Sequence, residues 1–262
     1  MTVTQDKTSS TSPVIPDRTT MNMLEMNEAL RNLYLEYVDE MYKNTWDEGI
    51  SSPLLMNVPD EYHLMKRKIL FVGQETHSWM GKMNDKREVE TLQTDYKGFD
   101  LGKKVIYGKK DFPRQLNSQF WNFIRNYFLG VNLRTDTTIS KKTSGFLWTN
   151  ISKFDYNGGT PTTHQKSNNT LGFSLLKKEV EIVRPDIIVF LIGKKYDQDL
   201  AKQFCFKENE NFKSDYLSIL TEEKVKDPIL IFKTFHPTYL CRSGKNREVL
   251  KQMINMTNGI VG

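Results

Sequence analysis

The sequence predicts a single α/β domain in which helices cover both faces of a central parallel sheet of four strands, a three-layer α/β/α arrangement. Four short apolar runs rich in β-branched residues have the character of fully buried strands. Helical patterns of apolar residues separate these runs along the chain. In addition, 262 residues with 38% hydrophobic content are enough for one sizeable core, and no Pro/Gly-rich linker divides the chain.

The chain opens with a polar segment that is followed by an amphipathic helix. Residues 1–20 are rich in Ser, Thr and Pro and are predicted to be a flexible tail, which leaves 21–262 as the single domain. Apolar side chains then recur every three or four residues between Leu30 and Met41. This spacing places them on one face of a helix that we expect to end near Asn44.

Strands and further helices alternate over the rest of the chain. The predicted strands are residues 69–72, 146–149, 187–191 and 229–232. The predicted helices are residues 120–128, 175–183, 201–206 and 247–254, and Pro185 marks the end of the second of them. Because helices connect successive strands, the strands should run parallel and the sheet should be covered on both faces.

Composition excludes several classes of protein. The two cysteines, Cys205 and Cys241, are too few for a four-thiolate zinc or iron–sulfur site and favour a reducing compartment. His63 and His164 lack partners at metal-ligand spacing, so we predict no metal. The longest apolar stretch, residues 187–192, is far shorter than the roughly 20 residues that span a bilayer, and the N-terminal segment lacks an apolar signal region. We expect a cytoplasmic monomer that contacts no membrane.

The net charge of +5 is concentrated in one part of the chain. Between Lys97 and Lys142, ten basic residues stand against three acidic ones. Aromatic residues are interleaved with this run, namely Tyr96, Phe99, Tyr107 and Phe112. Basic and aromatic side chains together are typical of a loop that follows phosphates and stacks on bases, which would make DNA a partner. On composition alone, an ordinary solvated lysine-rich loop is the favoured interpretation.

Polar side chains follow all four predicted strands. The first strand leads into Gly73-Gln74-Glu75-Thr76-His77, the second into Asn150-Ile151-Ser152-Lys153, the third into Gly193-Lys194 and the fourth into Thr234-Phe235-His236-Pro237-Thr238. Ligands of open parallel sheets bind outside the carboxyl ends of the strands. We therefore expect a carboxylate, an amide, two histidines and lysines at one rim of the sheet.

These strand ends, together with Arg184-Pro185-Asp186-Ile187-Ile188, resemble the uracil-DNA glycosylase superfamily from about residue 68 to residue 254. The most specific part is His236-Pro237-Thr238-Tyr239-Leu240-Cys241-Arg242, which is followed by a stretch similar to the next helix of that family. The resemblance implies the family's three-layer fold. It also implies a DNA glycosylase that flips a pyrimidine out of DNA and hydrolyses its N-glycosidic bond with water, without a cofactor.

The reaction explains these residue types, because it builds positive charge on the sugar and negative charge on the departing base. The resemblance implies that Glu75 orients the attacking water or stabilises the oxocarbenium ion, and that His236 donates a hydrogen bond to O2 of the base. Asn150 would read the Watson–Crick edge of the flipped base, and Leu240 would fill the gap left in the duplex. The remaining assignments are Gln74 and His77 to base binding, and Lys153, Arg242 and Lys245 to DNA binding.

Two departures from the family pattern bear on the substrate and on the cofactor. Many members have Pro followed by Tyr or Gly where this chain has Thr76 and His77, and the Tyr rejects pyrimidines with a substituent at C5. The change favours a C5-modified pyrimidine, such as hydroxymethylated or glucosylated cytosine in phage DNA, over uracil, and with it a role in antiviral defence. Phe154 stands where the iron–sulfur subfamilies carry Cys, so no cluster is expected.

Each of these residues also has an ordinary structural interpretation. Glu75 could cap a helix, His236 could be a histidine satisfied at a strand end, and His77 could face solvent. Asn150 could stabilise a turn, and core packing explains Leu240 as well as insertion into DNA does. For the whole protein, the alternatives are a DNA-binding protein on the same fold without catalysis and a small-molecule hydrolase.

Overall fold

The computed structural model describes residues 21–99, 118–132, 145–162, 170–212, 214–222 and 229–259. The predicted tail of residues 1–20 lies outside these ranges, and so does most of the basic run between Lys97 and Lys142. The assignment of that run to DNA contact therefore stays a prediction from composition.

Four neighbouring strands of the sheet run parallel, as the sequence predicts. They are β1 (Ile69–Gly73), β2 (Leu147–Asn150), β3 (Ile187–Leu191) and β6 (Leu230–Thr234), in the spatial order β2-β1-β3-β6. Every residue of β1, β2 and β3 is buried. Strands covered on both faces need apolar side chains on both sides of the backbone, which explains their unbroken apolar runs.

Two further strands extend the sheet to six and make it mixed. β5 (Leu217–Glu222) pairs antiparallel with β6, and β4 (Phe206–Glu208) pairs antiparallel with β5. The sequence did not predict them, because β4 has only three residues, none of them buried, and β5 is partly exposed and carries polar residues. Phe206, predicted to end a helix, instead begins β4, because α6 (Asp197–Gln203) ends before it.

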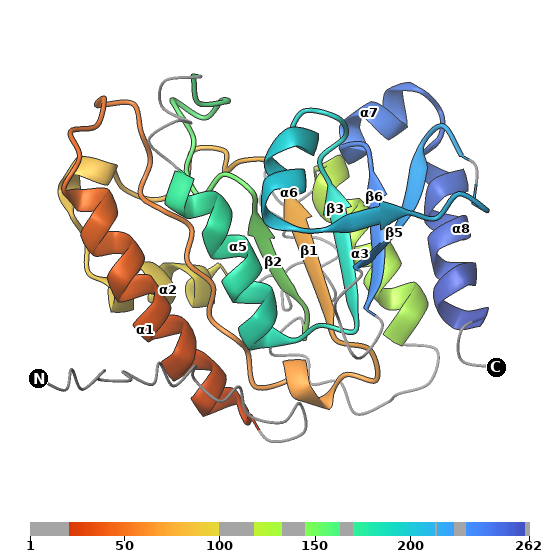
Figure 1. Ribbon diagram of the computed structural model, residues 1–262, viewed down its shortest axis with the longest axis horizontal. Helices are drawn as coiled ribbons and strands as arrows, with labels where there is room; N and C mark the ends of the chain where they lie inside the picture. The colour runs from red at the N-terminus through yellow and green to blue at the C-terminus, as the bar shows by residue number, and fades with distance from the viewer. Residues whose placement is uncertain are drawn as a thin grey trace, which may run out of the picture.

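Helices lie on both faces of the sheet (Figure 1). On one face α1 (Met23–Tyr42) packs against α5 (Thr170–Val183), with α2 (Val89–Gly98) next to α1 and α6 next to α5. On the other face α3 (Gln119–Asn132) packs against both α7 (Pro237–Arg242) and α8 (Asn246–Gly259). The predicted helices are thus confirmed, except that the one predicted at 201–206 begins and ends earlier, as α6, while α2 and α7 were not predicted. None of the helices in the described ranges combines the length and apolar character needed to cross a bilayer.

The carboxyl ends of the parallel strands lie at one edge of the sheet. Gly73 at the end of β1 is in register with Asn150 at the end of β2, and Leu191 of β3 is in register with Thr234 of β6. This edge is at the top of Figure 1, where α7 also lies, whereas the short helix η1 (Tyr62–Leu64) lies at the opposite edge. The segments that follow the four strands therefore share one rim.

Candidate active site

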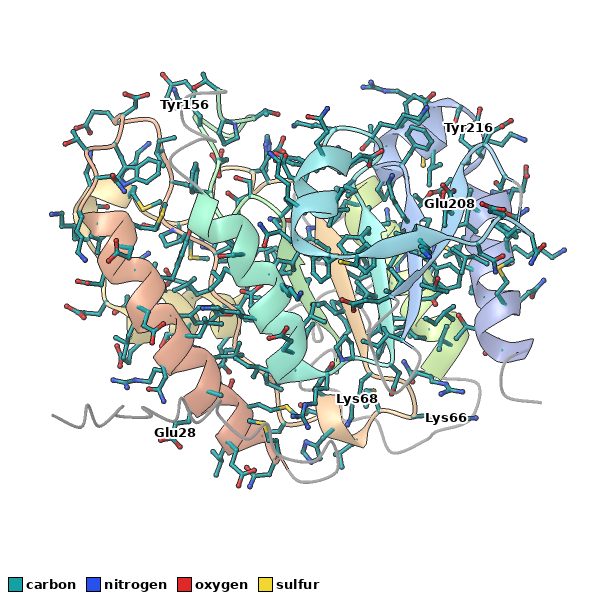
Figure 2. All side chains as sticks on the ribbon, in the orientation of Figure 1. Glu28, Lys66, Lys68, Tyr156, Glu208 and Tyr216 are labelled. Atoms are coloured by element: carbon teal, nitrogen blue, oxygen red, sulfur yellow. The ribbon has the colours of Figure 1, made fainter. Side chains whose placement is uncertain are left out.

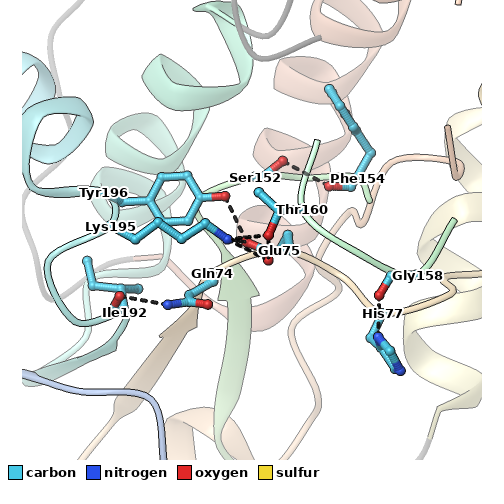
Figure 3. Close-up of polar contacts among 10 residues, drawn as sticks. All are labelled: Gln74, Glu75, His77, Ser152, Phe154, Gly158, Thr160, Ile192, Lys195 and Tyr196. Atoms are coloured by element: carbon cyan, nitrogen blue, oxygen red, sulfur yellow. Dashed lines mark hydrogen bonds and ion pairs between the residues drawn. The ribbon is translucent and has the colours of Figure 1, made fainter. Parts of the chain in front are cut away.

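The carboxylate of Glu75 is the centre of a polar cluster at this rim (Figure 3). Lys195 Nζ donates to both carboxylate oxygens, at 2.7 and 2.9 Å, and Thr160 Oγ1 donates to Oε1 at 2.6 Å. The hydroxyl of Tyr196 donates to Oε2 at 2.7 Å. Glu75 follows β1, Lys195 and Tyr196 follow β3, and Thr160 lies in the loop after β2. Three strand ends thus converge on one carboxylate.

The surroundings of Glu75 keep it ionised. Burial raises the pKa of this carboxyl, but hydrogen bonds from Lys195, Thr160 and Tyr196 lower it by more, so the net shift of the pKa is downward. Burial raises the pKa of the Tyr196 hydroxyl, and the negative charge of Glu75 raises it further. Tyr196 therefore stays protonated and acts as a donor, and Glu75 is a carboxylate at neutral pH.

His236 sits at the start of α7 and presents one ring nitrogen as a donor. Its Nδ1 accepts a hydrogen bond from the backbone N–H of Thr238 at 3.3 Å, so in the neutral ring the proton is on Nε2. Burial lowers the pKa of His236, the charge of Glu75 raises it, and the charge of Lys195 lowers it, with a downward net shift. The imidazole is therefore neutral at neutral pH, and it lies within electrostatic reach of the Glu75 cluster.

Asn150 is buried at the end of β2, against the backbone of Gly73. A Cβ atom at Gly73 would lie 2.2 Å from Asn150 Oδ1 and 3.3 Å from Phe120 Cζ, so only glycine leaves room for these side chains. The Phe120 ring is stacked with His236, with centroids 5.6 Å apart and planes inclined by 13°. Asn150, Phe120 and His236 are thus neighbours around the end of β1.

The loop after β1 is held by residues that face away from this centre. Thr76 is buried, and its hydroxyl donates to Asp155 Oδ2 at 2.6 Å; Asp155 also accepts hydrogen bonds from two backbone N–H groups. His77 is exposed, and its Nδ1 contacts the carbonyl oxygen of Gly158. Figure 3 shows His77 beside Gly158, to one side of the Glu75 cluster. The hydrogen bonds to Glu75 come instead from Lys195, Thr160 and Tyr196.

Gln74 connects two strand ends. Its Nε2 donates to the carbonyl oxygen of Ile192, just after β3, at 2.8 Å (Figure 3). The side chain is half-buried. One amide hydrogen is therefore committed to the scaffold, and the assignment of Gln74 to base binding stays a prediction.

The prediction that Lys153 contacts DNA is wrong for this structure. The side chain is fully buried and forms an ion pair with Glu179 of α5, and Nζ also donates to Thr149 Oγ1 at 2.6 Å. Glu179 accepts a further hydrogen bond from the hydroxyl of Tyr34 at 2.8 Å. Burial lowers the pKa of Lys153, and Glu179 opposes this shift. The chain turns back after β2, so the lysine points into the core, away from the surface.

The prediction that Leu240 enters the duplex is also wrong for this structure, because its side chain is fully buried in the core. Tyr239, its neighbour, is 50% exposed. Of the other residues predicted to bind DNA, Arg242 is exposed, and Lys245 forms an ion pair with Glu248 at 2.9 Å.

Sequence reasoning did not assign a role to Lys195, Tyr196 or Thr160. Lys195 could have been predicted, because it follows Gly193 and Lys194 at the end of the third predicted strand. Thr160 had no such signal, since its position depends on the path of the loop after β2.

Within the described ranges, no group of three or more His, Cys, Asp or Glu side chains could hold a metal ion. An ionised carboxylate and a neutral N–H donor at one rim are suited to stabilising opposite charges that develop in a substrate.

The comparison with known families is consistent with this geometry. The model of the Uracil DNA glycosylase superfamily matches residues 59–257, which span all four parallel strands and every residue of the Glu75 cluster. The resemblance found in the sequence is thereby confirmed. No curated protein matches the chain.

Proposed function

This chain belongs to the uracil DNA glycosylase superfamily, and from that premise we propose that it is a monofunctional DNA glycosylase with Glu75 and His236 as its catalytic residues. Members of this superfamily are generally DNA glycosylases. The observation that carries the proposal is the placement of an ionised carboxylate and a neutral imidazole donor at the same rim. We include in the proposal a monomer that acts on DNA in the cytoplasm without a cofactor.

In the proposed reaction the bond between C1′ and the pyrimidine nitrogen breaks, and its electron pair leaves with the base. The sugar becomes an oxocarbenium ion that takes up water at C1′, which leaves an abasic site and a released proton. Glu75 stabilises the positive charge on the sugar and orients the water. Lys195, Thr160 and Tyr196 already donate hydrogen bonds to both oxygens of Glu75. Glu75 therefore contributes mainly by electrostatic stabilisation and less as a proton acceptor.

His236 acts on the departing base. Its Nε2–H donates to O2 of the pyrimidine, where negative charge accumulates, and the neutral ring needs no proton transfer for this. Removal of one such donor typically slows a reaction by about 10²–10³-fold. Asn150 reads the Watson–Crick edge of the flipped base, since its amide carries both a donor and an acceptor.

Lys195 is a positioning residue in this scheme. It holds both oxygens of Glu75 and supplies the positive charge that helps to keep the carboxyl ionised at 12% side-chain exposure. Thr160 and Tyr196 fix the same rotamer from two other directions. The carboxylate is thereby set in place before the substrate arrives.

We propose a C5-modified pyrimidine as the favoured substrate, for example hydroxymethylated or glucosylated cytosine of phage DNA, with uracil as the default otherwise. The support is that positions 76 and 77 carry no tyrosine: the Thr76 hydroxyl donates to Asp155, and His77 lies beside Gly158, to one side of the Glu75 cluster (Figure 3). The tyrosine that excludes a C5 substituent in many members is thus missing from this loop. Such a substrate would fit a role in antiviral defence.

The test is release of free base from DNA that contains uracil, hydroxymethyluracil, hydroxymethylcytosine or glucosylated hydroxymethylcytosine, followed by mass spectrometry. His236→Ala should lose release about 10²–10³-fold and still bind DNA. His63→Ala is the matched control, because His63 is an exposed histidine of η1 at the opposite edge of the sheet. Retained DNA binding with no release from any substrate would instead favour a non-catalytic DNA-binding protein.

A further inference from the structure

Three aromatic side chains form a row on the surface next to His236. Phe235 is stacked with Tyr239, with ring centroids 4.8 Å apart and planes inclined by 28°, and its other neighbour is Tyr216, at 5.9 Å. Tyr239 is 50% exposed, and the other two are partly exposed. Figure 2 labels Tyr216 at the end of the molecule where α7 lies. We call Tyr216, Phe235 and Tyr239 the aromatic ledge.

The aromatic ledge is continuous with the Glu75 cluster. Phe235 directly precedes His236, and its ring lies over the turn after β3, where a Cβ atom at Gly193 would be 3.2 Å from Phe235 Cδ1. Gly193 has a φ of +61°, which favours glycine, and the same turn carries Lys195 two residues later. The ledge is therefore fixed to the backbone that positions the catalytic carboxylate.

The direction of Tyr239 follows from how α7 packs. Leu240 points into the core and is fully buried, so its neighbour Tyr239 faces out from the same short helix. The fold gains little from an aromatic ring that remains half exposed. This large exposed ring next to the proposed catalytic histidine points to a ligand with a flat apolar face.

Cationic groups flank the aromatic ledge. The Lys245 ammonium lies 5.7 Å from the centre of the Tyr216 ring while it is also paired with Glu248. Arg242 is exposed at the end of α7, and within the described ranges it has no ion-pair partner. Exposed aromatic rings with neighbouring cations are the combination that binds unpaired nucleic acid, because bases stack on the rings and phosphates meet the charges.

We propose that the aromatic ledge binds, by stacking on Tyr239, the nucleobase next to the flipped nucleotide, and that the preferred substrate is therefore single-stranded DNA. A base can lie against Tyr239 only if it has left the stack of its own strand. Rejection of duplex DNA follows from the energy needed to unstack that second base. The flipped nucleotide belongs to the proposed glycosylase function, on which this part of the inference rests.

The experiment uses single-stranded oligonucleotides with 2-aminopurine on either side of the target base, because stacking on an aromatic ring quenches its fluorescence. We expect the wild-type protein to quench the probe on one side. Tyr239→Ala should abolish the quenching and weaken binding about 5- to 100-fold, as expected for the loss of one base–aromatic stack. Tyr239→Phe should retain both. Leu64→Ala, an exposed apolar residue of η1 at the opposite edge, is the control that should change neither.

Other outcomes would overturn the inference. Unchanged quenching in Tyr239→Ala would show that no base stacks on Tyr239. Tight binding of Tyr239→Leu to duplex DNA would show that residue 239 acts as a wedge in a duplex. A change in oligomeric state without a change in DNA binding would make the ledge a contact between copies of the chain. Thermal unfolding of each variant checks that the fold is intact.

Failure of this inference can be told apart from failure of the glycosylase proposal. If base is released and quenching is unchanged in Tyr239→Ala, the glycosylase proposal stands and the proposal that the aromatic ledge binds a base fails. Loss of quenching and binding in Tyr239→Ala, without base release from any DNA, would leave a nucleic-acid site on a protein that is not a glycosylase.

Discussion

Two lysine–glutamate pairs in this molecule have the same types of partner but differ in exposure. Each glutamate is bonded to one lysine, one threonine and one tyrosine. In the core pair both side chains are fully buried, whereas in the rim pair the glutamate and lysine side chains are 12% and 31% exposed. The rim pair is Glu75–Lys195 with Thr160 and Tyr196, and the core pair is Glu179–Lys153 with Thr149 and Tyr34.

The position of a lysine–glutamate pair in the fold decides whether it contributes to stability or to a site. The core pair joins α1, β2 and α5 beneath the site, where no ligand can reach it. Its charges have lost their hydration, so their mutual attraction is needed to compensate for burial. The rim pair lies at the carboxyl ends of the strands, near His236, and can face a substrate. We therefore expect damage to the core pair to act on stability and damage to the rim pair to act on catalysis.

The largest expected effect is on catalysis by Glu75→Gln. The single-turnover rate of base release should fall about 10²–10⁴-fold, because a neutral amide cannot balance the positive charge on the sugar. Affinity for DNA should change little. Glu179→Gln is the matched control from the core pair: it should lower the free energy of unfolding while the folded fraction keeps its rate. Equal losses of rate in Glu75→Gln and Glu179→Gln would show that the rim pair and the core pair do not differ in their effect on catalysis.

The second effect is on stability, measured by urea unfolding. Lys153→Met should lower the free energy of unfolding by about 3–5 kcal/mol, because the charge of Glu179 is left buried without its partner. The double variant Lys153→Met with Glu179→Leu should recover most of this loss, since neither charge then remains in the core. A single variant as stable as the wild type would show that the pair is not needed to compensate for burial.

A third, smaller effect tests the link between the two regions, because Asn150 of the site lies three residues before Lys153. Gly73→Ala would place a Cβ atom 2.2 Å from Asn150 Oδ1, so the amide must move. The rate of base release should fall about 10- to 100-fold, and the crowding should lower the free energy of unfolding by about 1–3 kcal/mol. Gly98→Ala is the control, as a Cβ atom there meets no atom within 4 Å. Full activity of Gly73→Ala would mean that the position of the Asn150 amide is not critical.

The smallest effect at neutral pH concerns Lys195→Met, and it appears in the pH profile. Burial raises the pKa of Glu75, and hydrogen bonds with Lys195 are among the causes that bring it below the ordinary value. Without Lys195 the pKa rises, so Glu75 becomes protonated at a higher pH as the solution is acidified. The acid limb of the profile of base release should therefore move to higher pH, and the rate above it should stay close to that of the wild type because Thr160 and Tyr196 still hold the carboxylate. An unmoved acid limb would show that Lys195 does not control the ionisation of Glu75.

The sequence was sufficient to predict the parallel sheet and three of its rim residues. Apolar β-branched runs mark strands that are buried on both faces, and the polar residues after such strands must meet at one edge, which is how Glu75, Asn150 and His236 were found. β4 and β5 lack that signal, because antiparallel strands at the edge of a sheet are short and partly polar. The residue pattern of a strand therefore predicts whether the strand is buried, but it says less about which strands pair with it.

The errors concern side chains whose direction depends on tertiary packing. Lys153 looks like a surface residue in the sequence, and only the position of Glu179 on α5 explains why it is buried. The choice between Leu240 and Tyr239 depends on α7, which begins at Pro237 and turns Leu240 inward. Thr160 reaches Glu75 from a loop that has no pattern of its own.

The proposal that Glu75 is catalytic in glycosidic cleavage is tested most directly by a single-turnover assay of base release. Wild type, Glu75→Gln and Glu179→Gln should be compared on DNA that carries each candidate base, with the folded fraction measured in parallel. We predict that the wild type releases one kind of pyrimidine and leaves an abasic site, that Glu75→Gln binds the DNA but releases almost none, and that folded Glu179→Gln behaves as the wild type. Release by Glu75→Gln at the wild-type rate, or no release by the wild type from any of these DNAs, would contradict it.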